Sequence, residues 1–359
     1  MPELPEVEAM RGLLERHCVG CKVLRVISLE AGGGPLDGKF DSKVIGEGVG
    51  PQQLEAALLR RPVLAARRRG KHLWLELGGQ GPQLLFHCGM TGALAIDGVE
   101  RFSFQSFRVD EAWPPRFTKL QLELGGRGQE PTRLAFADPR RFGKVLLRQN
   151  AAEEPPVSLL GPDPLASPFP LEAFAEQLRR SAAPVKALLL DQEKAVCGVG
   201  NWVADEVLRE ARVHPAAPAR TLSDGQLAAL HRGVLSVLKR AVAVDADAAR
   251  FPKNWLFHCR WGQGPSGAGV CLPDGSEVAF EDVGGRTTAY VPALQRPGER
   301  PAGAGEAASK PRPAGRAARK RPAAAGSPEQ AEAMKRPAAA AARFRVPLRG
   351  APAAAVDLA

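Results

Sequence analysis

The sequence has no long apolar segment. No run approaches the roughly 18 apolar residues of a membrane span, so we expect no transmembrane helix. The N-terminus has no basic stretch followed by an apolar one, so we expect no secretory signal. The six cysteines include one C-x-x-C pair, Cys18 and Cys21, without a second pair at zinc-ribbon spacing. We therefore expect reduced thiols and no bound metal.

Acidic and aromatic residues are scarce in the last sixth of the chain. The 359 residues have 49 Lys and Arg against 39 Asp and Glu, and residues 296–359 alone have 13 against 5, a net charge of +8. With Phe344 as its only aromatic residue, this tail cannot bury a core and is predicted to be disordered. The sequence KRPAAA occurs at 320–325 and 335–340, which suits DNA contact or nuclear import. The alternative is a solvated spacer without a partner.

Hydrophobic periodicity divides the rest of the chain. Residues 1–150 combine one N-terminal helix with short runs of period two, which predicts an antiparallel β-sandwich or barrel. Six prolines mark 151–170 as a linker, and 171–250 have helical periodicity. Aromatic residues, glycines and Thr/Val pairs in 251–295 predict a β-hairpin. The fold class is α+β.

The helical part is predicted to contain four helices. The first carries Leu171, Phe174 and Leu178, and the second runs from Pro184 to about Lys194. The third runs from Trp202 to Arg212. The fourth follows a capping box formed by Ser223 and Gln226.

The first residues combine a nucleophile with carboxylates. Once Met1 is removed, Pro2 presents a secondary amine, and α-amino groups have a reference pKa of about 7.7–8.0, so a useful fraction is neutral. Glu3 and Glu6 follow within one helical turn and are placed to transfer protons. The same residues also suit an ordinary helix start, with Val7, Met10, Leu14 and Cys18 on one apolar face.

Two segments are candidates for binding phosphate. The turn Gly198-Val199-Gly200-Asn201 precedes a helix whose first N–H groups are predicted to be unpaired, and Asn201 adds a side-chain donor. The basic run RRRGKH at 67–72 leads into a strand with Lys71. The alternatives are a tight turn between helices and a solvated charged face.

Two glycine-containing segments resemble probes that enter a DNA helix. HCGMTG at 87–92 carries Met90 on a turn, and DPRRFG at 138–143 carries Arg140 and Phe142. An enzyme that removes a base from the stack must fill the hole, and these side chains suit that purpose. Alternatively, Met90 and Phe142 are core residues.

Taken together, these motifs resemble the Fpg/Nei (MutM) family of DNA glycosylases, which remove a damaged base and then cleave the abasic site. The resemblance covers residues 1 to about 292. Its motifs stand in family order: PELPEVE at the start, RRRGKHL at 67–73, GMTG at 89–92, DPRRFG at 138–143, GPDPL at 161–165, VKALLLDQEKAVCGVGNWVADE at 185–206 and GGRTTAYVP at 284–292.

The resemblance implies a role for each matching residue. Pro2 is the nucleophile, Glu3 the general acid and base, and Glu6 a supporting carboxylate. Lys71 and Asn201 hold phosphates, and the hairpin Arg286 contacts another. The space left by the extruded nucleotide is filled by Met90, Arg140 and Phe142. Lys186 and Glu206 match further positions near the lesion.

Two departures from the bacterial pattern stand out. The finger region has only Cys259 and Cys271 instead of four cysteines, which indicates a zincless finger of the plant type. Residues 244–253 are shorter than the bacterial loop that caps extruded 8-oxoguanine. We therefore expect formamidopyrimidines and hydantoins as substrates and leave 8-oxoguanine open.

We accordingly expect a bifunctional glycosylase and lyase of base excision repair that acts on damaged double-stranded DNA through a Pro2 Schiff base and β,δ-elimination. We expect a nuclear monomer without cofactor or membrane contact; partners of the tail are unknown. The alternatives are a non-catalytic DNA- or chromatin-binding protein and an unrelated helix-turn-helix module. Pro2 and Glu3 favour the enzyme, because a pure binding protein needs no such amine.

Overall fold

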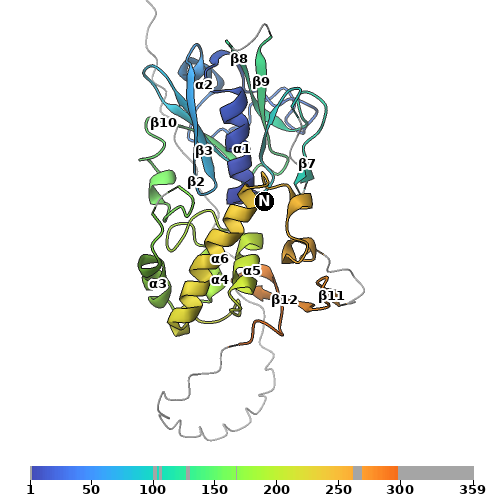
Figure 1. Ribbon diagram of the computed structural model, residues 1–359. Helices are drawn as coiled ribbons and strands as arrows, with labels where there is room; N and C mark the ends of the chain where they lie inside the picture. The colour runs from blue at the N-terminus through green and yellow to red at the C-terminus, as the bar shows by residue number, and fades with distance from the viewer. Residues whose placement is uncertain are drawn as a thin grey trace, which may run out of the picture. The chain divides into compact units, whose positions relative to one another are not determined.

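The computed structural model describes residues 2–99, 103–104, 107–126, 130–166, 168–261 and 269–297 (Figure 1). The predicted tail, 296–359, lies outside these residues except for its first two. Within the described part, no helix combines the length and the hydropathy needed to cross a membrane.

Helix α1 (Leu4–His17) begins where the sequence predicts. Its first turn is closed by the backbone N–H of Glu3, which donates to Oε2 of Glu6 at 3.0 Å. The predicted apolar face of Val7, Met10, Leu14 and Cys18 is fully buried. This face packs into the core between two sheets, so the hydrophobic effect orients the helix and carries its N-terminal end towards the helical part of the chain (Figure 1).

The N-terminal part is the predicted β-sandwich, made of two antiparallel four-stranded sheets. The first has the order β1 (Lys22–Ile27), β8 (Thr118–Gly125), β9 (Thr132–Ala137) and β5 (Ala93–Ile96). The second has the order β10 (Lys144–Arg148), β4 (Gln83–His87), β3 (His72–Leu77) and β2 (Val63–Arg69). A short ribbon pairs β6 (Ser103–Phe104) with β7 (Phe107–Arg108). The period-two patterns are confirmed as strands.

The structure adds helix α2 (Pro51–Leu58), which the sequence did not predict. Only Leu54 and Leu58 of its eight residues are buried, so its apolar periodicity is too short to recognise.

The helical part contains the four predicted helices: α3 (Leu171–Arg179), α4 (Val185–Leu190), α5 (Asn201–Glu210) and α6 (Asp224–Val242). The capping box at Ser223 and Gln226 is present. Helix α4 is shorter than predicted, because Asp191 takes an extended conformation with ψ 110°. Helix α5 ends before Arg212, which has a left-handed φ of 53°.

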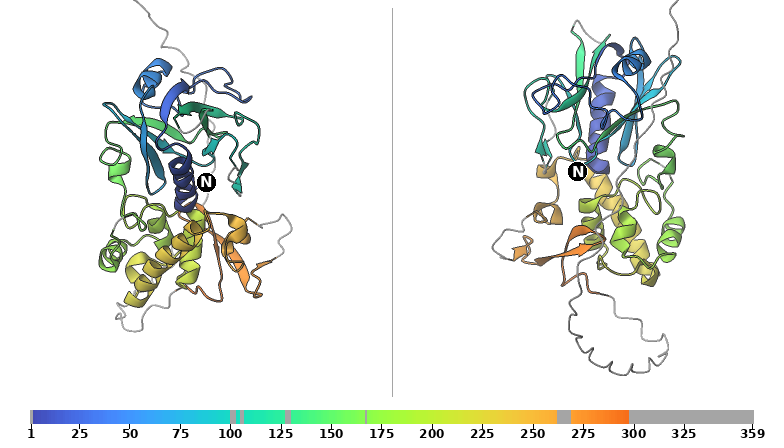
Figure 2. Two further views of the ribbon diagram at one scale, coloured as in Figure 1. Left: turned by 45° about the horizontal axis from the view of Figure 1, so that its top comes forward. Right: turned by 180° about the vertical axis from the view of Figure 1, so that it is seen from behind.

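The remaining elements are short. The described residues include four 3₁₀ turns: η1 (Val157–Leu159), η2 (Ala219–Thr221), η3 (Ala248–Arg250) and η4 (Leu256–His258). The predicted hairpin consists of β12 (Glu277–Val283) and β13 (Arg286–Tyr290), with β11 (Val270–Cys271) at its edge. Gly284 and Gly285 form its turn with φ of 63° and 73°, which glycine adopts without strain. The hairpin lies beside α5 (Figure 2).

Candidate active site

The carboxylate of Glu3 lies at the N-terminus of helix α5. It accepts the backbone N–H of Trp202 at 3.0 Å on Oε1 and that of Val203 at 3.1 Å on Oε2, and the side chain is 2% exposed. A negative charge is favoured there, because the first N–H groups of a helix lack partners within it. We predicted that the first N–H groups of this helix are open to a phosphate. This is wrong for the N–H groups of Trp202 and Val203, because Glu3 accepts both.

The glycines of the turn before α5 make room for this contact. A Cβ on Gly200 would lie 2.2 Å from Cδ of Glu3, and one on Gly198 would lie 2.4 Å from Cδ1 of Leu4. Gly198 also has a φ of 88°, and its carbonyl accepts the N–H of Leu4 at 3.1 Å. The Gly-x-Gly spacing therefore admits the start of the chain.

Glu6 joins the same cluster from the first turn of α1. Its Oε1 accepts the indole Nε1–H of Trp202 at 3.1 Å, and its Oε2 accepts the N–H of Glu3. Burial, together with the neighbouring charge of Glu3, raises the pKa of Glu6 to about 7. Glu6 is therefore able to exchange a proton near neutral pH. Trp202 is a site residue that the sequence did not indicate, because only the contact of its indole N–H with Glu6 in the folded protein identifies it.

Lys71 reaches the other side of this turn. Its Nζ donates to the carbonyl of Val199 at 2.9 Å, and that carbonyl also accepts Nε2 of Gln192 at 2.8 Å. Burial lowers the pKa of Lys71, although Glu3 and Glu6 act in the opposite direction. The ammonium is nearly enclosed by protein. The structure thus brings together Glu3, Glu6 and Lys71 around residues 198–200.

Asn201 links this turn to the hairpin. Its Nδ2 donates to the carbonyl of Thr287 at 2.9 Å, while its Oδ1 is buried without a hydrogen-bond partner. The adjacent Arg286 is exposed and lies close enough to Lys71 for its charge to oppose protonation of that amine. Three of the predicted phosphate ligands, Lys71, Asn201 and Arg286, therefore share one neighbourhood.

The arginines of the basic run have partners within the protein. Arg68 pairs with Asp163 at 2.5 Å and with Glu8 at 2.6 Å. Arg67 pairs with Glu76, and Arg69 donates to the carbonyl of Leu160 at 2.8 Å. Arg68 is therefore not available for the predicted phosphate contact, because its side chain is only 4% exposed, whereas that of Arg67 is 57% exposed. Arg68 and Arg69 hold β2 against the linker, and Asp163 of the linker also accepts the backbone N–H of Gly70 at 2.7 Å.

Met90, Arg140 and Phe142 lie on two loops joined by one buried carboxylate. Asp138 accepts the hydroxyl of Thr91 at 2.7 Å, the N–H of Arg140 at 3.2 Å and the N–H of Gly143 at 2.6 Å. These bonds clamp the segments 87–92 and 138–143 together. Met90 is partly buried and Arg140 is exposed.

Phe142 is not a core residue. The residue is 49% exposed, and Nζ of Lys43 and Cζ of Arg140 each lie 5.3 Å from the centroid of its ring. The core alternative for Phe142 is therefore wrong. An exposed aromatic ring flanked by cations suits stacking on bases beside phosphates.

Lys186 is placed differently from our expectation. It is 0% exposed, and its Nζ lies 2.6 Å from Oδ1 of Asp205 and 2.7 Å from Oγ1 of Thr288. Asp205 also pairs with Arg260 at 2.8 Å. In this arrangement Lys186 cannot touch DNA, because its ammonium is fully enclosed. The cluster instead joins α4, α5 and the hairpin.

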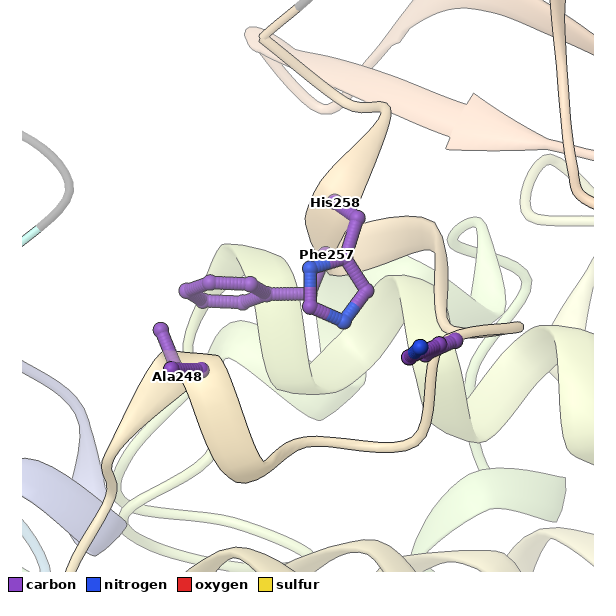
Figure 3. Close-up of a pocket in the computed structure, with 5 residues that line it drawn as sticks. Ala248, Phe257 and His258 are labelled. Carbon is purple, nitrogen blue, oxygen red and sulfur yellow. The ribbon is translucent and has the colours of Figure 1, made fainter.

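Glu206 is also buried, next to a cavity of about 430 Å³. Its Oε1 accepts the N–H of Phe257 at 2.6 Å, and burial raises the pKa of Glu206 to about 8. The cavity is lined by Ala248, Ala249, Lys253, Phe257 and His258. Figure 3 shows the side chains of Ala248, Phe257 and His258 at this pocket. Glu206 thus supports a wall of the cavity and does not enter it.

The finger thiols do not form a zinc site by themselves. Sγ of Cys259 lies 3.7 Å from the carbonyl of Cys271, and two thiolates leave a tetrahedral ion short of ligands. Among the described residues, no three His, Cys, Asp or Glu side chains are grouped to hold a metal. The zincless finger stays a prediction, which metal analysis of the purified protein would test.

Family models identify the two parts of the chain that build this site. Residues 1–145 match the formamidopyrimidine-DNA glycosylase N-terminal domain, and residues 160–253 match the H2TH domain of the same enzyme. A formamidopyrimidine-DNA glycosylase of Arabidopsis thaliana is 42% identical over 298 residues, covering 82% of this chain and 71% of that protein. The chain belongs to the formamidopyrimidine-DNA glycosylase family.

More distant members agree with this assignment. A formamidopyrimidine-DNA glycosylase from a Nocardioides species is 34% identical and covers 82% of this chain and 94% of its own. The wild-type Lactococcus lactis Fpg, solved with DNA containing an oxidized pyrimidine, has a TM-score of 0.65 at 26% identity, covering 82% of this chain and all of that one. The predicted family and the α+β fold are confirmed.

Proposed function

We propose that this member of the family is a DNA glycosylase and abasic-site lyase of base excision repair that uses the amine of Pro2 as its nucleophile. Curated relatives are named formamidopyrimidine-DNA glycosylases, and Lactococcus lactis Fpg has been solved with DNA containing Fapy-dG. The enzyme class follows from the family. The lesion, the nucleophile and the residue roles are our proposals.

The observation that supports the nucleophile is the position of Glu3. Pro2 precedes it directly, so the carboxylate fixed on α5 holds the amine at the edge of the 198–200 turn. Met1 must be removed first, because an amide nitrogen is not nucleophilic. The geometry then joins an amine, a carboxylate and the Lys71 ammonium in one buried cluster.

The reaction can be written with these groups and water. Glu3 protonates O4′ of the damaged nucleotide, the bond from C1′ to O4′ breaks and the sugar ring opens, while the Pro2 nitrogen forms a bond to C1′. The Pro2 N–H gives its proton to the base, the bond from C1′ to the base breaks with its electron pair going to the base, and the nitrogen lone pair forms a C1′ iminium ion. Loss of a C2′ proton releases the 3′ phosphate, loss of a C4′ proton releases the 5′ phosphate, and water hydrolyses the remaining iminium ion to free the Pro2 amine.

The remaining predicted residues have four kinds of role. Glu6 buffers the protonation of Glu3, and Lys71, Asn201 and Arg286 contact the phosphates around the extruded nucleotide. Met90, Arg140 and Phe142 occupy the vacated space. Their clamped loops, and the exposure of Phe142, support this role. Lys186 and Glu206 act as buried supports of the helices and of the cavity beside η4.

We also propose the compartment and the division of the chain. The catalytic core consists of residues 1–150, 171–250 and 251–295, with 151–170 as linker. The basic repeats of residues 296–359 favour the nucleus, and the tail adds non-specific DNA affinity. A C-terminally intact fluorescent fusion found only in the cytosol or in an organelle would contradict the nuclear proposal.

Borohydride trapping tests the central proposal. The protein without Met1 is mixed with duplex DNA containing a formamidopyrimidine, reduced and digested, and the crosslinked peptide is sequenced. We expect the adduct on the nitrogen of Pro2, because reduction converts the iminium ion to a stable amine. A variant that retains an N-terminal extension is the control and should not crosslink. An adduct on Lys71 would refute the assignment, and binding without any adduct would favour the non-catalytic alternative.

A further inference from the structure

The loop that carries Arg140 and Phe142, residues 138–143, has an unusual backbone. Arg141 has a φ of 57°, in the left-handed region that residues other than glycine rarely adopt. Its guanidinium donates two hydrogen bonds to one carboxylate, from Nε to Oδ2 of Asp41 at 2.7 Å and from Nη2 to Oδ1 at 2.9 Å. This two-point contact fixes the orientation of Arg141 as well as its position.

Asp41 is itself fixed to the sandwich. It is 1% exposed, and its Oδ2 lies 3.2 Å from Nζ of Lys119 on strand β8. Lys119 also pairs with the buried Glu30. Burial opposes ionisation of Asp41, but the hydrogen bonds and charges of Arg141 and Lys119 outweigh it and lower its pKa. The loop is thus tied by charge to the middle of a sheet.

The Asp41 carboxylate also orders Lys43, a second neighbour of the exposed Phe142 ring. Oδ1 of Asp41 accepts the backbone N–H of Lys43 at 3.1 Å, and the Lys43 ammonium lies over the ring of Phe142. Arg141 precedes that ring in the chain. Asp41 therefore holds two residues next to Phe142: Arg141, which precedes it in the chain, and Lys43, which lies over its ring.

We propose that Asp41 is a positioning residue that sets the 138–143 loop before DNA binds, so that Phe142 enters the base stack in a formed loop. This inference rests on the proposed function. Insertion into stacked bases is disfavoured if the loop must be ordered at the same step, and a preformed loop avoids that entropic cost. Asp41 is buried and contacts Arg141, Lys43 and Lys119, so its effect is confined to steps that need insertion.

The test compares two substrates for one variant. Asp41→Asn keeps the shape of the side chain but removes its charge. We expect single-turnover excision of a formamidopyrimidine from duplex DNA to slow by about ten-fold, which corresponds to about 1.4 kcal/mol. Borohydride trapping on single-stranded DNA with a preformed abasic site should be unchanged, because no stack has to be opened. A fluorescent base opposite the lesion should report slower insertion.

The chain offers a matched control. Glu47 lies in the same segment and forms a two-point ion pair with Arg148 on β10, at 2.6 and 2.7 Å, without touching the 138–143 loop. Glu47→Gln should leave both substrates unaffected. Arg141→Gln removes the more exposed partner of the Arg141–Asp41 pair. It replaces Asp41→Asn in the test if Asp41→Asn fails to fold. In the double variant, the loss should not exceed that of Asp41→Asn alone, because the Arg141 contact is already removed.

Three outcomes separate the possibilities. Duplex excision at the wild-type rate in Asp41→Asn, or in Arg141→Gln if the first variant does not fold, would overturn the inference. Equal losses on the duplex and on the single strand would also overturn it, since they would indicate general damage to the fold. A wild-type protein that forms no adduct on either substrate would refute the proposed function itself.

Discussion

Replacing Glu3 by Gln separates the two tasks of one carboxylate. Glu3 accepts two backbone N–H groups at the start of α5 and is the proposed proton donor to the sugar. The amide keeps one accepting oxygen and puts an NH₂ group in place of the other. One of the N–H groups of Trp202 and Val203 therefore loses its acceptor, and the side chain can no longer transfer a proton.

The structural part of this change can be estimated. A hydrogen bond to a charged group contributes about 1.5–3 kcal/mol, and an anion at a helix N-terminus about 0.3–1 kcal/mol. We therefore expect the free energy of unfolding to fall by about 2–3 kcal/mol. Domains are typically stable by about 5–15 kcal/mol, so the variant should still fold at room temperature.

The catalytic part should be larger. A positioned general acid or base contributes about 10²–10⁴-fold, so base excision should fall by that factor. Single-turnover release of a formamidopyrimidine from duplex DNA measures it. Trapping on a preformed abasic site should persist, because Pro2 then meets a free aldehyde. Glu15→Gln on the same helix, where Glu15 contacts Arg11 and the N–H of Ala66, is the control and should retain excision.

The result that would refute this reasoning is clear. Excision at the wild-type rate would exclude Glu3 as the proton donor. Loss of excision and trapping together, with a lowered unfolding temperature, would mean that Glu3 acts only by holding α5.

The remaining predictions concern charge. Because the folded pKa of Glu206 is raised from an ordinary 4.5 to about 8, its contribution to stability is complete below pH 4.5 and is lost as the pH rises to about 8. Between pH 4.5 and 8, the unfolding free energy of the wild type should therefore fall more steeply with pH than that of Glu206→Gln, by about 1.4 kcal/mol per pH unit. Denaturant titrations at several pH values measure both slopes. Equal slopes in the two proteins would contradict the buried placement of Glu206. Arg286→Ala should weaken lesion-DNA binding by about 1.5–3 kcal/mol in anisotropy titrations without lowering stability, and equal affinity at low salt would argue against a phosphate contact. Deleting residues 296–359 should leave single-turnover cleavage near normal and flatten the salt dependence of binding, whereas loss of cleavage in a folded core would place the tail in the active site.

Local patterns in the sequence determined the elements and the family. The apolar face of α1, the period-two strands, the capping box of α6 and the glycine turn of the hairpin depend on residues a few positions apart, so periodicity reveals them. The order of short motifs identified the family. Helix α2 was missed because its local signal is only two buried leucines.

The tertiary structure alone decided which charged groups are available. Arg68 and Lys186 carry the positive charge expected of residues that bind DNA, yet inside the protein they are paired with Asp163 and Asp205. Asp41 lies 100 residues from Arg141 and belongs to no recognised motif. Such pairs form because packing brings distant segments together, and a buried charge requires a partner wherever the chain supplies one. The spacing of residues in the sequence does not show which distant partner a charged group takes. The sequence therefore suggested a free acid at Glu3, whereas in the fold this carboxylate caps helix α5.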